Sequence, residues 1–245
     1  MWMLENAFLI PLVPTISFVV ILFFGKKFIG ADRVHVVGIG ALGLVWILSA
    51  VAAFQWIQRV EDPPPEAVVK IEHHDDHGDA HAGDDHGDAH GGGHAGDGHG
   101  GGHSSPLIRP VISTFSQWWS NSGIDFAVGT FVDGQTVLLL MVVASISLLV
   151  HIYSTEYVKG DRRYVHYYAF LSLFTASMLF FVMAQNIVQL IVGWELVGVC
   201  SFALIGHWWE EKPNTDAALK AFLTNRVGDV GLLVGHCARF PKRAA

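Results

Sequence analysis

Cysteine is almost absent from this 245-residue chain, which contains only Cys200 and Cys237. Two cysteines form neither a disulfide framework nor a four-thiolate zinc or iron–sulfur site. The sequence also lacks a basic patch or a basic helix face, so nucleic acid is not an expected partner. No glycine-rich fingerprint follows a predicted strand, and a nicotinamide or flavin site is therefore not expected in this chain.

Lysine and arginine are missing from one long segment, Glu72–His103. Its 32 residues contain eight acidic residues, nine of the chain's 14 histidines and 11 of its 26 glycines. The whole chain has a formal net charge of −7, and the rest of it, without this segment, is nearly neutral. The charge therefore belongs to one segment, and the other residues have to be interpreted separately.

Those other residues contain apolar runs that are too long for a soluble core. A run of about 18 or more apolar residues is long enough to cross a bilayer as a helix. Six runs are candidates: Ala7–Phe24, Val34–Trp56, Gln135–Ile152, Tyr167–Ala184, Ile187–Gly206 and Ala217–Gly235. The first is interpreted as a retained helix because Lys26 and Lys27 follow it and no basic residue precedes it, the reverse of a signal peptide. The predicted fold class is an all-α membrane protein, a polytopic bundle of about six transmembrane helices.

Composition divides the chain into five parts. Residues 1–57 hold the first two helices, and residues 58–105 form a His-, Asp- and Gly-rich segment that cannot bury a core and is expected to be disordered. Residues 106–134 are expected to form an outer surface segment, because the alternation over Ile124–Val128 predicts a short β-hairpin. Residues 135–235 hold helices three to six, and residues 236–245 form a basic, Pro-interrupted tail.

The basic residues of the short loops predict the orientation. They follow the first, third and fifth helices: Lys26, Lys27, Arg33, Lys159, Arg162, Arg163 and Lys212. By the positive-inside rule these loops are cytoplasmic, which places the amino terminus and the His-rich segment outside the cell membrane of a bacterium.

The histidine run has two interpretations. Its repeats, HGDAH and HGGGH, bring imidazoles and carboxylates together, and His77, His81, His86 and His90 are weak candidates for zinc, nickel or copper ligands. The alternative is a solvated insertion, which the high glycine content favours because ordering such a segment costs much conformational entropy. No metal site is predicted elsewhere in the chain.

Ionisable residues within the apolar runs are the candidate functional residues. Glu195 lies near the middle of its run, where a charge is costly and usually functional. In the last run, Arg226 is within pairing reach of Asp229 at i, i+3, and Asn225 lies on the same side of the helix. These residues are either a simple ion pair or the polar lining of a proton path. His151 is a weaker candidate, either a proton relay or an interfacial histidine.

Three motifs resemble one family. They are Gly193–Phe202 (GWELVGVCSF), Val150–Tyr157 (VHIYSTEY) and Lys220–Asp229 (KAFLTNRVGD). They resemble subunit L of bacterial NADH-quinone oxidoreductase, the counterpart of chain 5 of mitochondrial complex I. The resemblance extends from Met1 to about Gly235, apart from the His-rich segment, and Phe202 replaces a more usual Tyr.

The resemblance implies an antiporter-like membrane subunit of an enzyme complex. Glu195 would be the essential carboxylate of helix five, with Asp229 and Arg226 the acid and base of helix six, and together they would carry protons. The resemblance places NADH, FMN, iron–sulfur clusters and quinone in partner subunits, and implies other antiporter-like membrane subunits and the lipid bilayer as partners.

Two other functional classes remain open, and the sequence departs from the family pattern in one respect. The large subunit of a multi-subunit sodium/proton antiporter shares the buried Glu, and a metal-binding membrane protein built around the His run is a third class. The family continues through further helices, one with a Lys that pairs with the Glu, whereas this sequence leaves the pattern at His236. We therefore expect a truncated chain that is inactive alone.

Overall fold

The computed structural model describes residues 2–26, 30, 33–65, 67–69, 107–121 and 124–239. The chain divides into two units, Met1–Asp62 with Pro110–Ala245, and Pro63–Arg109. The second unit contains a pair of two-residue antiparallel strands, β1 (Val68–Val69) and β2 (Leu107–Ile108). His77, His81, His86 and His90, and the disorder expected around them, lie outside the described residues.

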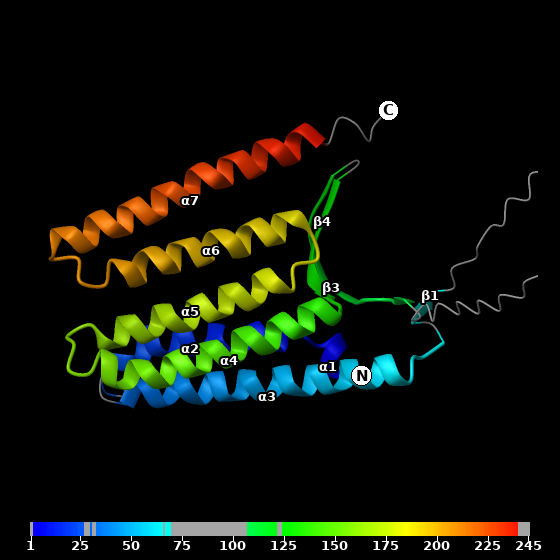
Figure 1. Ribbon diagram of the computed structural model, residues 1–245, viewed down its shortest axis with the longest axis horizontal. Coiled ribbons are helices and arrows are strands. Elements are labelled where there is room, and N and C mark those ends of the chain that lie inside the picture. Colours follow the sequence, from blue (N-terminus) through cyan, green and yellow to red (C-terminus); the bar gives the residue numbers. More distant parts are fainter. Residues whose placement is uncertain are drawn as a thin grey trace, which may run out of the picture. The chain divides into compact units, whose positions relative to one another are not determined.

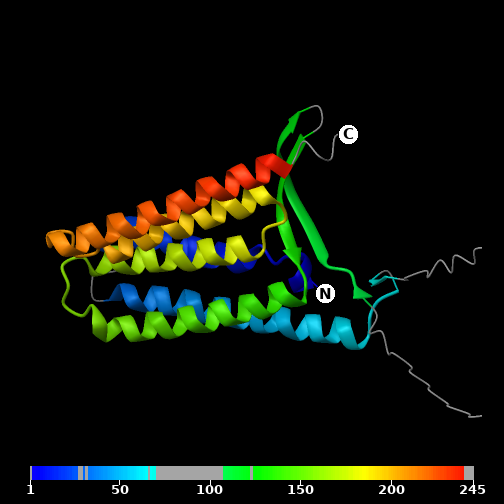
Figure 2. The same cartoon turned by 45° about the horizontal axis from the view of Figure 1, so that its top comes forward.

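The first unit is a bundle of antiparallel helices with one hairpin. A single-turn helix comes first, and six longer helices and two strands follow: α1 (Trp2–Glu5), α2 (Leu9–Phe24), α3 (Val34–Glu61), β3 (Val111–Asn121), β4 (Ile124–Val132), α4 (Gly134–Tyr157), α5 (Tyr164–Val182), α6 (Ile187–Ile205) and α7 (Lys212–Arg239). The helices run back and forth between two ends (Figures 1 and 2). We call the end with the α4–α5 and α6–α7 turns the loop end, and the end with β3 and β4 the hairpin end.

Four described helices are long and apolar enough to cross a membrane: α3, α4, α5 and α6. The helix α2 is equally apolar but has 16 residues, and α7 has 28 residues but contains several charged side chains. All six expected helices are present, and the expected fold class, a polytopic helical membrane bundle, is confirmed.

Several helices extend beyond the apolar runs that predicted them. The helix α4 continues from Ile152 to Tyr157, α5 begins at Tyr164 instead of Tyr167, and α7 begins at Lys212. Hydropathy marks the apolar part of a span, whereas backbone hydrogen bonding continues into polar residues at its ends.

Asparagine and aspartate side chains fix the starts of two helices at the hairpin end. The carboxylate of Asp133 accepts a hydrogen bond from the Thr136 amide (2.7 Å), and the Asn186 side chain accepts one from the Gln189 amide (2.9 Å). Both residues are N-caps, which satisfy backbone donors that a helix start leaves free. The second cap sets the register of α6.

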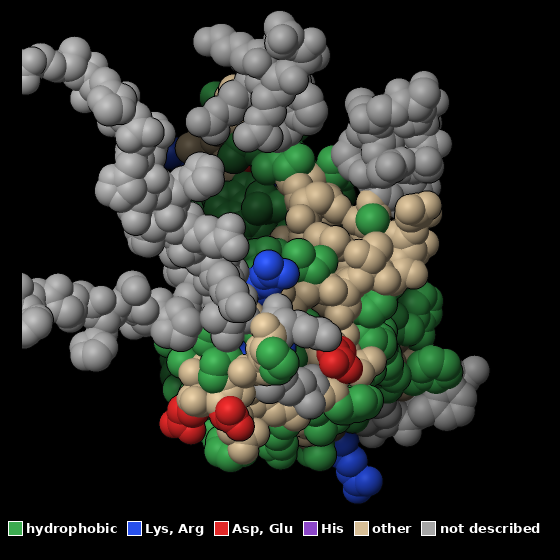
Figure 3. All heavy atoms as spheres, turned by 90° about the vertical axis from the view of Figure 1, so that its right-hand side faces the viewer, with side chains coloured by type: hydrophobic (Ala, Val, Ile, Leu, Met, Phe, Trp, Pro, Cys, Tyr) green, Lys and Arg blue, Asp and Glu red, His purple; other side chains and the backbone are tan. Residues whose placement is uncertain are grey.

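The predicted hairpin is confirmed, with longer strands than the alternation indicated. β3 and β4 pair antiparallel from Val111↔Val132 to Asn121↔Ile124, with irregularities near Phe115 and Trp118. Figure 3 views the hairpin end, where apolar side chains form much of the described surface among a few charged ones.

The hairpin is joined to the start of α6 by Gln189. Its side-chain amide accepts from the Gly129 amide (3.3 Å) and donates to the Gly129 carbonyl (2.8 Å). A Cβ at Gly129 would lie 2.4 Å from the carbonyl oxygen of Ser113. Only glycine fits there without displacing backbone.

Two buried clusters hold the bundle together. Near the hairpin end, α1, α3, α4 and α5 contribute residues such as Leu4, Val45, Leu140 and Leu179. Near the loop end, Ile21, Val34 and Val165 pack with Tyr164 and Tyr168. The helix α5 contacts α2, α3, α4 and α6, and α7 packs on α6.

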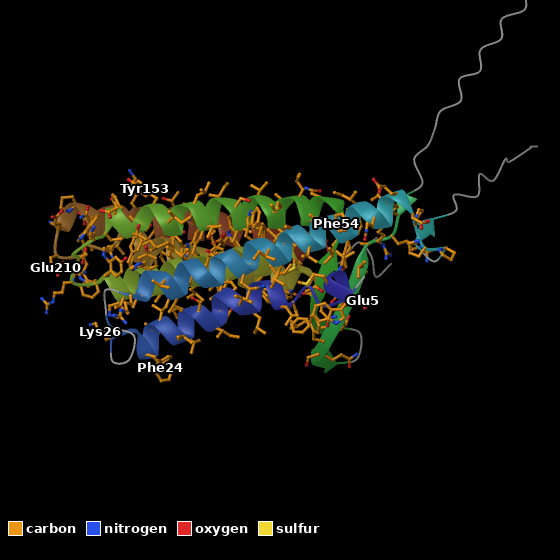
Figure 4. All side chains as sticks on the ribbon, turned by 90° about the horizontal axis from the view of Figure 1, so that it is seen from below. Glu5, Phe24, Lys26, Phe54, Tyr153 and Glu210 are labelled. Atoms are coloured by element: carbon orange, nitrogen blue, oxygen red, sulfur yellow. The ribbon has the colours of Figure 1, made fainter. Side chains whose placement is uncertain are left out.

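The basic residues of the short loops meet at the loop end. Lys26 and Glu210 lie there and Glu5 lies at the opposite end, while Phe24 points away from the neighbouring helices (Figure 4). Lys159, Arg162 and Arg163 occupy the α4–α5 turn at the same end. The loops that the positive-inside rule groups together therefore share one end, and which side of the membrane it faces stays a prediction.

Candidate functional site

Glu195 is the ninth residue of α6. At 1.5 Å per residue its Cα lies about 12 Å along the axis, well inside a membrane-spanning helix. Its side chain is 33% exposed and faces α7. A carboxylate at this depth needs a partner, because the hydrocarbon layer offers no water to stabilise its charge.

Arg226 of α7 supplies that partner. Its guanidinium contacts the Glu195 carboxylate, and its Nη2 reaches the Glu195 carbonyl oxygen at 3.5 Å. On its own helix, Nη1 lies 3.5 Å from Oδ2 of Asp229, one turn away. The predicted i, i+3 pair is therefore confirmed, and the structure adds the contact with Glu195. One guanidinium is shared by two carboxylates.

Trp194 binds the second carboxylate from the opposite helix. Its indole Nε1 donates a hydrogen bond to Oδ1 of Asp229 across 2.7 Å. An indole N–H can only donate, so Asp229 is the acceptor in this bond. Asp229, 15% exposed, thus receives hydrogen bonds from Trp194 on α6 and from Arg226 on α7.

Glycines on α6 create the space that this arrangement needs. A Cβ at Gly198 would lie 3.2 Å from Nη2 of Arg226, so the guanidinium occupies room that an alanine would reduce. On another face, a Cβ at Gly193 would lie 2.9 Å from Cα of Phe181, which shows how closely α5 and α6 approach. The other face of the guanidinium lies 4.6 Å from the centre of the Phe222 ring, a cation–π contact.

Both carboxylates line a small cavity of about 150 Å³ between α6 and α7. Its remaining lining is apolar, apart from the indole N–H of Trp194: Phe181, Leu190, Ile191, Leu232 and Leu233. The group has two acids and one base, so it has one excess negative charge when both carboxylates are ionised. Uptake of one proton would neutralise it.

The two weaker candidates lie outside this group. His151 is fully buried between α4 and α5, with Nδ1 2.9 Å from the Ser147 carbonyl oxygen and Nε2 3.5 Å from Oγ of Ser172. Its position is buried rather than at an exposed helix end. Asn225 is exposed on α7. The structure therefore brings together Glu195, Arg226 and Asp229, and does not bring His151 or Asn225 to them.

The roles of Trp194 and Phe222 are not visible in the sequence. Trp194 and Asp229 are 35 positions apart, and their contact depends on how the α6–α7 turn folds α7 back onto α6. The only available signal is that Trp194 adjoins Glu195, which does not identify the partner of its N–H group.

A polar cluster in the turns at the loop end holds the start of α7. Oδ2 of Asp161 accepts from Nε1 of Trp208 (2.7 Å) and lies 3.2 Å from Nε2 of His207, while Oδ1 accepts from the Arg163 amide (2.8 Å). Arg163 donates to the His207 carbonyl (2.6 Å) and pairs with Glu210. The α4–α5 turn is thereby tied to the α6–α7 turn.

The same contacts set the charge states of two acids in these turns. Partial burial acts to raise the pKa of Asp161, but the Arg163 amide, Trp208 and His207 together hold this pKa below its usual 3.8. The hydrogen bond from Arg163 lowers the pKa of Glu210. Both carboxylates remain ionised to lower pH than free ones.

Two segments of the chain match known families. Residues 118–168 match the N-terminus of chain 5 of NADH-ubiquinone oxidoreductase (complex I), and residues 184–241 match the transmembrane region of the NADH:quinone oxidoreductase/Mrp antiporter family. The second segment contains Glu195, Arg226 and Asp229.

Curated relatives agree with these matches. NAD(P)H-quinone oxidoreductase chain 5 of Synechocystis is 48% identical over 119 residues, which are 49% of this chain and 18% of that protein. The chloroplastic subunit 5 of Physcomitrium patens is 46% identical over 118 residues, and that of Nephroselmis olivacea 45% over 124. These two matches cover 48% and 51% of this chain and 16% and 19% of the relatives.

The matched part of this chain thus spans less than a fifth of the length of these relatives. Over residues 118–168 and 184–241, the chain is similar to complex I chain 5 and to the antiporter-like membrane subunits of the NADH:quinone oxidoreductase/Mrp family.

Proposed function

We propose that this chain is a proton-carrying membrane subunit of an NADH-quinone oxidoreductase. The observation that carries the proposal is the sharing of Arg226 by Glu195 and Asp229 at membrane depth. In this role, the two carboxylates take up and release a proton as Arg226 moves between them. Electron transfer takes place in other subunits.

The local chemistry supports this role. Movement of a guanidinium away from a carboxylate in an apolar cavity makes the charged form of that carboxylate more costly, and approach stabilises it. A shift of Arg226 toward Asp229 would therefore favour protonation of Glu195, and the reverse shift would favour proton release. The flexible Arg226 side chain already reaches both acids.

The assembly and location belong to the same proposal. We assign NADH, FMN, iron–sulfur clusters and quinone to partner subunits, and other antiporter-like membrane subunits as neighbours in the bilayer. The loop end, with its lysines and arginines, faces the cytoplasm of a bacterium, and the hairpin end faces outward.

A second candidate function comes from the family description of residues 184–241, which names both the oxidoreductase and the Mrp antiporter. As the large subunit of a sodium/proton antiporter, the chain would use the same carboxylates without electron-transfer partners. Purification of the chain from its own membranes distinguishes the two. Subunits that contain flavin and iron–sulfur clusters accompany it in the first case only.

The test of proton carrying is Glu195→Gln in the intact complex. The substitution keeps the shape and removes the proton-binding group, so we expect protons pumped per electron pair to fall while the complex remains assembled. Glu156→Gln is the control, because Glu156 is an exposed acid paired with Lys159 at the loop end. Pumping that is equally unaffected in both variants would refute the role of Glu195.

A further inference from the structure

Arg226 has a third contact besides its two carboxylates. The carbon at the centre of its guanidinium lies 4.6 Å from the centre of the Phe222 ring, one turn earlier on α7. Its nitrogens contact the Glu195 carboxylate and lie 3.5 Å from Oδ2 of Asp229. The ring lies against the middle of the group and the carboxylates bind its nitrogens, so the contacts use different parts of one side chain.

The geometry of α7 produces this contact. Phe222 and Arg226 are four residues apart and therefore lie on one side of the helix. Long side chains in a helix point back toward its start, onto the residue four positions earlier. Asp229 lies three residues away in the other direction. Along α7 the guanidinium thus lies between the ring and Asp229, while Glu195 approaches from α6.

The ring is itself held in place by α6. Phe202 packs on Phe222 with the ring centres 5.4 Å apart and the ring planes at 57°. One turn earlier on α6, a Cβ at Gly198 would lie 3.2 Å from Nη2 of Arg226. The helices α6 and α7, which lie side by side in Figures 1 and 2, therefore confine the guanidinium beside a ring that cannot follow it.

The ring attracts Arg226 in a way that the carboxylates do not. An aromatic face attracts a cation through its quadrupole, which does not change when a neighbouring acid takes up a proton. A guanidinium is not deprotonated in proteins, so Arg226 keeps its charge throughout. A carboxylate that becomes protonated loses most of its attraction for this cation. Without the ring, the guanidinium would be free to follow the acid that stays ionised and to leave the other.

We propose that Phe222 is a positioning residue of the proton-carrying site: its ring keeps the Arg226 guanidinium within reach of both Glu195 and Asp229 at each stage of proton transfer. The inference rests on the proposed function of the two acids. The ring limits the movement of the guanidinium to a short shift, so that each carboxylate keeps a cation nearby in its apolar cavity.

Fluorinated phenylalanines at position 222 of the intact complex test this role. Each added fluorine withdraws electron density from the ring face and weakens its attraction for a cation, while the ring keeps nearly the same size. We expect proton pumping to slow stepwise along the series, several-fold in total. The infrared band of a protonated carboxyl group should grow in parallel, and adding Glu195→Gln or Asp229→Asn should identify the acid that gives it.

Phe170 provides the matched control. It is a half-buried aromatic residue of α5 whose ring packs on Phe18, with the ring centres 6.5 Å apart. The same fluorinated series at position 170 should leave pumping and the carboxyl band unchanged. Phe222→Leu keeps an apolar side chain without a ring and should pump slowly, whereas Phe222→Tyr keeps the ring face and should restore pumping to near the wild-type rate.

The outcomes separate this inference from the proposed function. Pumping that shows no trend along the series at position 222, or the same trend at position 170, would overturn the role of Phe222. If Glu195→Gln still abolishes pumping in that preparation, only the role of Phe222 is lost. Normal pumping with Glu195→Gln would instead remove the proposed function, and this inference with it.

Discussion

Trp194 and Asp229, on neighbouring helices, are joined by a hydrogen bond of 2.7 Å from the indole Nε1 to Oδ1. The bond gives Asp229 a donor on α6 in addition to Arg226 on its own helix. Trp194 therefore positions Asp229 against α6.

Substitution Trp194→Phe should impair proton pumping while the bundle remains folded. A hydrogen bond to a charged group contributes about 1.5 kcal/mol, which corresponds to roughly a tenfold change in rate or equilibrium. We expect pumping to slow by that order, and the infrared band of a protonated carboxyl group to increase. The band should disappear when Asp229→Asn is added. Trp46→Phe is the control, because Trp46 also donates to a neighbouring helix, to Ser145 at 3.1 Å.

Substitution Gly198→Ala tests the room beside Arg226. The new Cβ would lie 3.2 Å from Nη2, and the end of the arginine side chain can shift to relieve this contact. We expect a fold of near-normal stability, because alanine favours a helix over glycine by about 1 kcal/mol, together with several-fold slower pumping. The control Gly228→Ala, where a Cβ would meet nothing within 4 Å, should pump normally. Equal pumping in the two variants would show that the position of the guanidinium is unimportant.

Substitution Gly193→Ala should destabilise the bundle. Here the Cβ would lie 2.9 Å from backbone atoms of Phe181, which cannot move without shifting α5. Overpacking of this kind costs about 1–3 kcal/mol, so the thermal unfolding midpoint in detergent should fall. Gly231→Ala, where a Cβ would be in open space, should leave the midpoint unchanged or raise it. A midpoint for Gly193→Ala as high as that of Gly231→Ala would mean that α5 and α6 are less closely packed.

Acidification should weaken the loop end through Asp161. Because its pKa is lower in the folded chain than the usual 3.8, its ionised form stabilises the fold above pH 3.8, and this contribution is lost as pH falls through the lowered pKa. Asp161→Asn should reduce stability at neutral pH and flatten the decline below pH 3.8, measured as the unfolding midpoint against pH. Asp216→Asn, at an exposed position on α7, should leave the profile unchanged. A wild-type decline that persists in Asp161→Asn would assign it to other groups.

Long apolar runs were sufficient to predict the six helices, since few other structures satisfy backbone hydrogen bonds in a membrane. Their ends were harder to predict. Tyr164 and Lys212 begin α5 and α7 several residues before the apolar runs, because polar residues at a membrane surface fit a helix as well as a loop.

The candidate site was predictable along one helix and not between helices. Spacing alone indicates that Arg226 reaches Asp229, since residues three apart lie on one side of a helix. The contact of Arg226 with Glu195 depends on the angle at which α7 returns along α6. This angle is determined by the turn from Gly206 to Glu211 and by the contacts of that turn with Asp161. Asp161 belongs to the α4–α5 turn, so the sequence of α6 and α7 alone does not predict that angle.

The pairing of Gln189 with Gly129 has a consequence for the backbone hydrogen bonding of β4. An exposed strand edge offers free amide and carbonyl groups on which a foreign strand can add. At Gly129 both groups are occupied by a single side-chain amide, which acts as a one-residue substitute for a neighbouring strand. Gln189 thereby completes the hydrogen bonding of β4 at this point, and a leucine in its place would leave a buried amide and a buried carbonyl without partners.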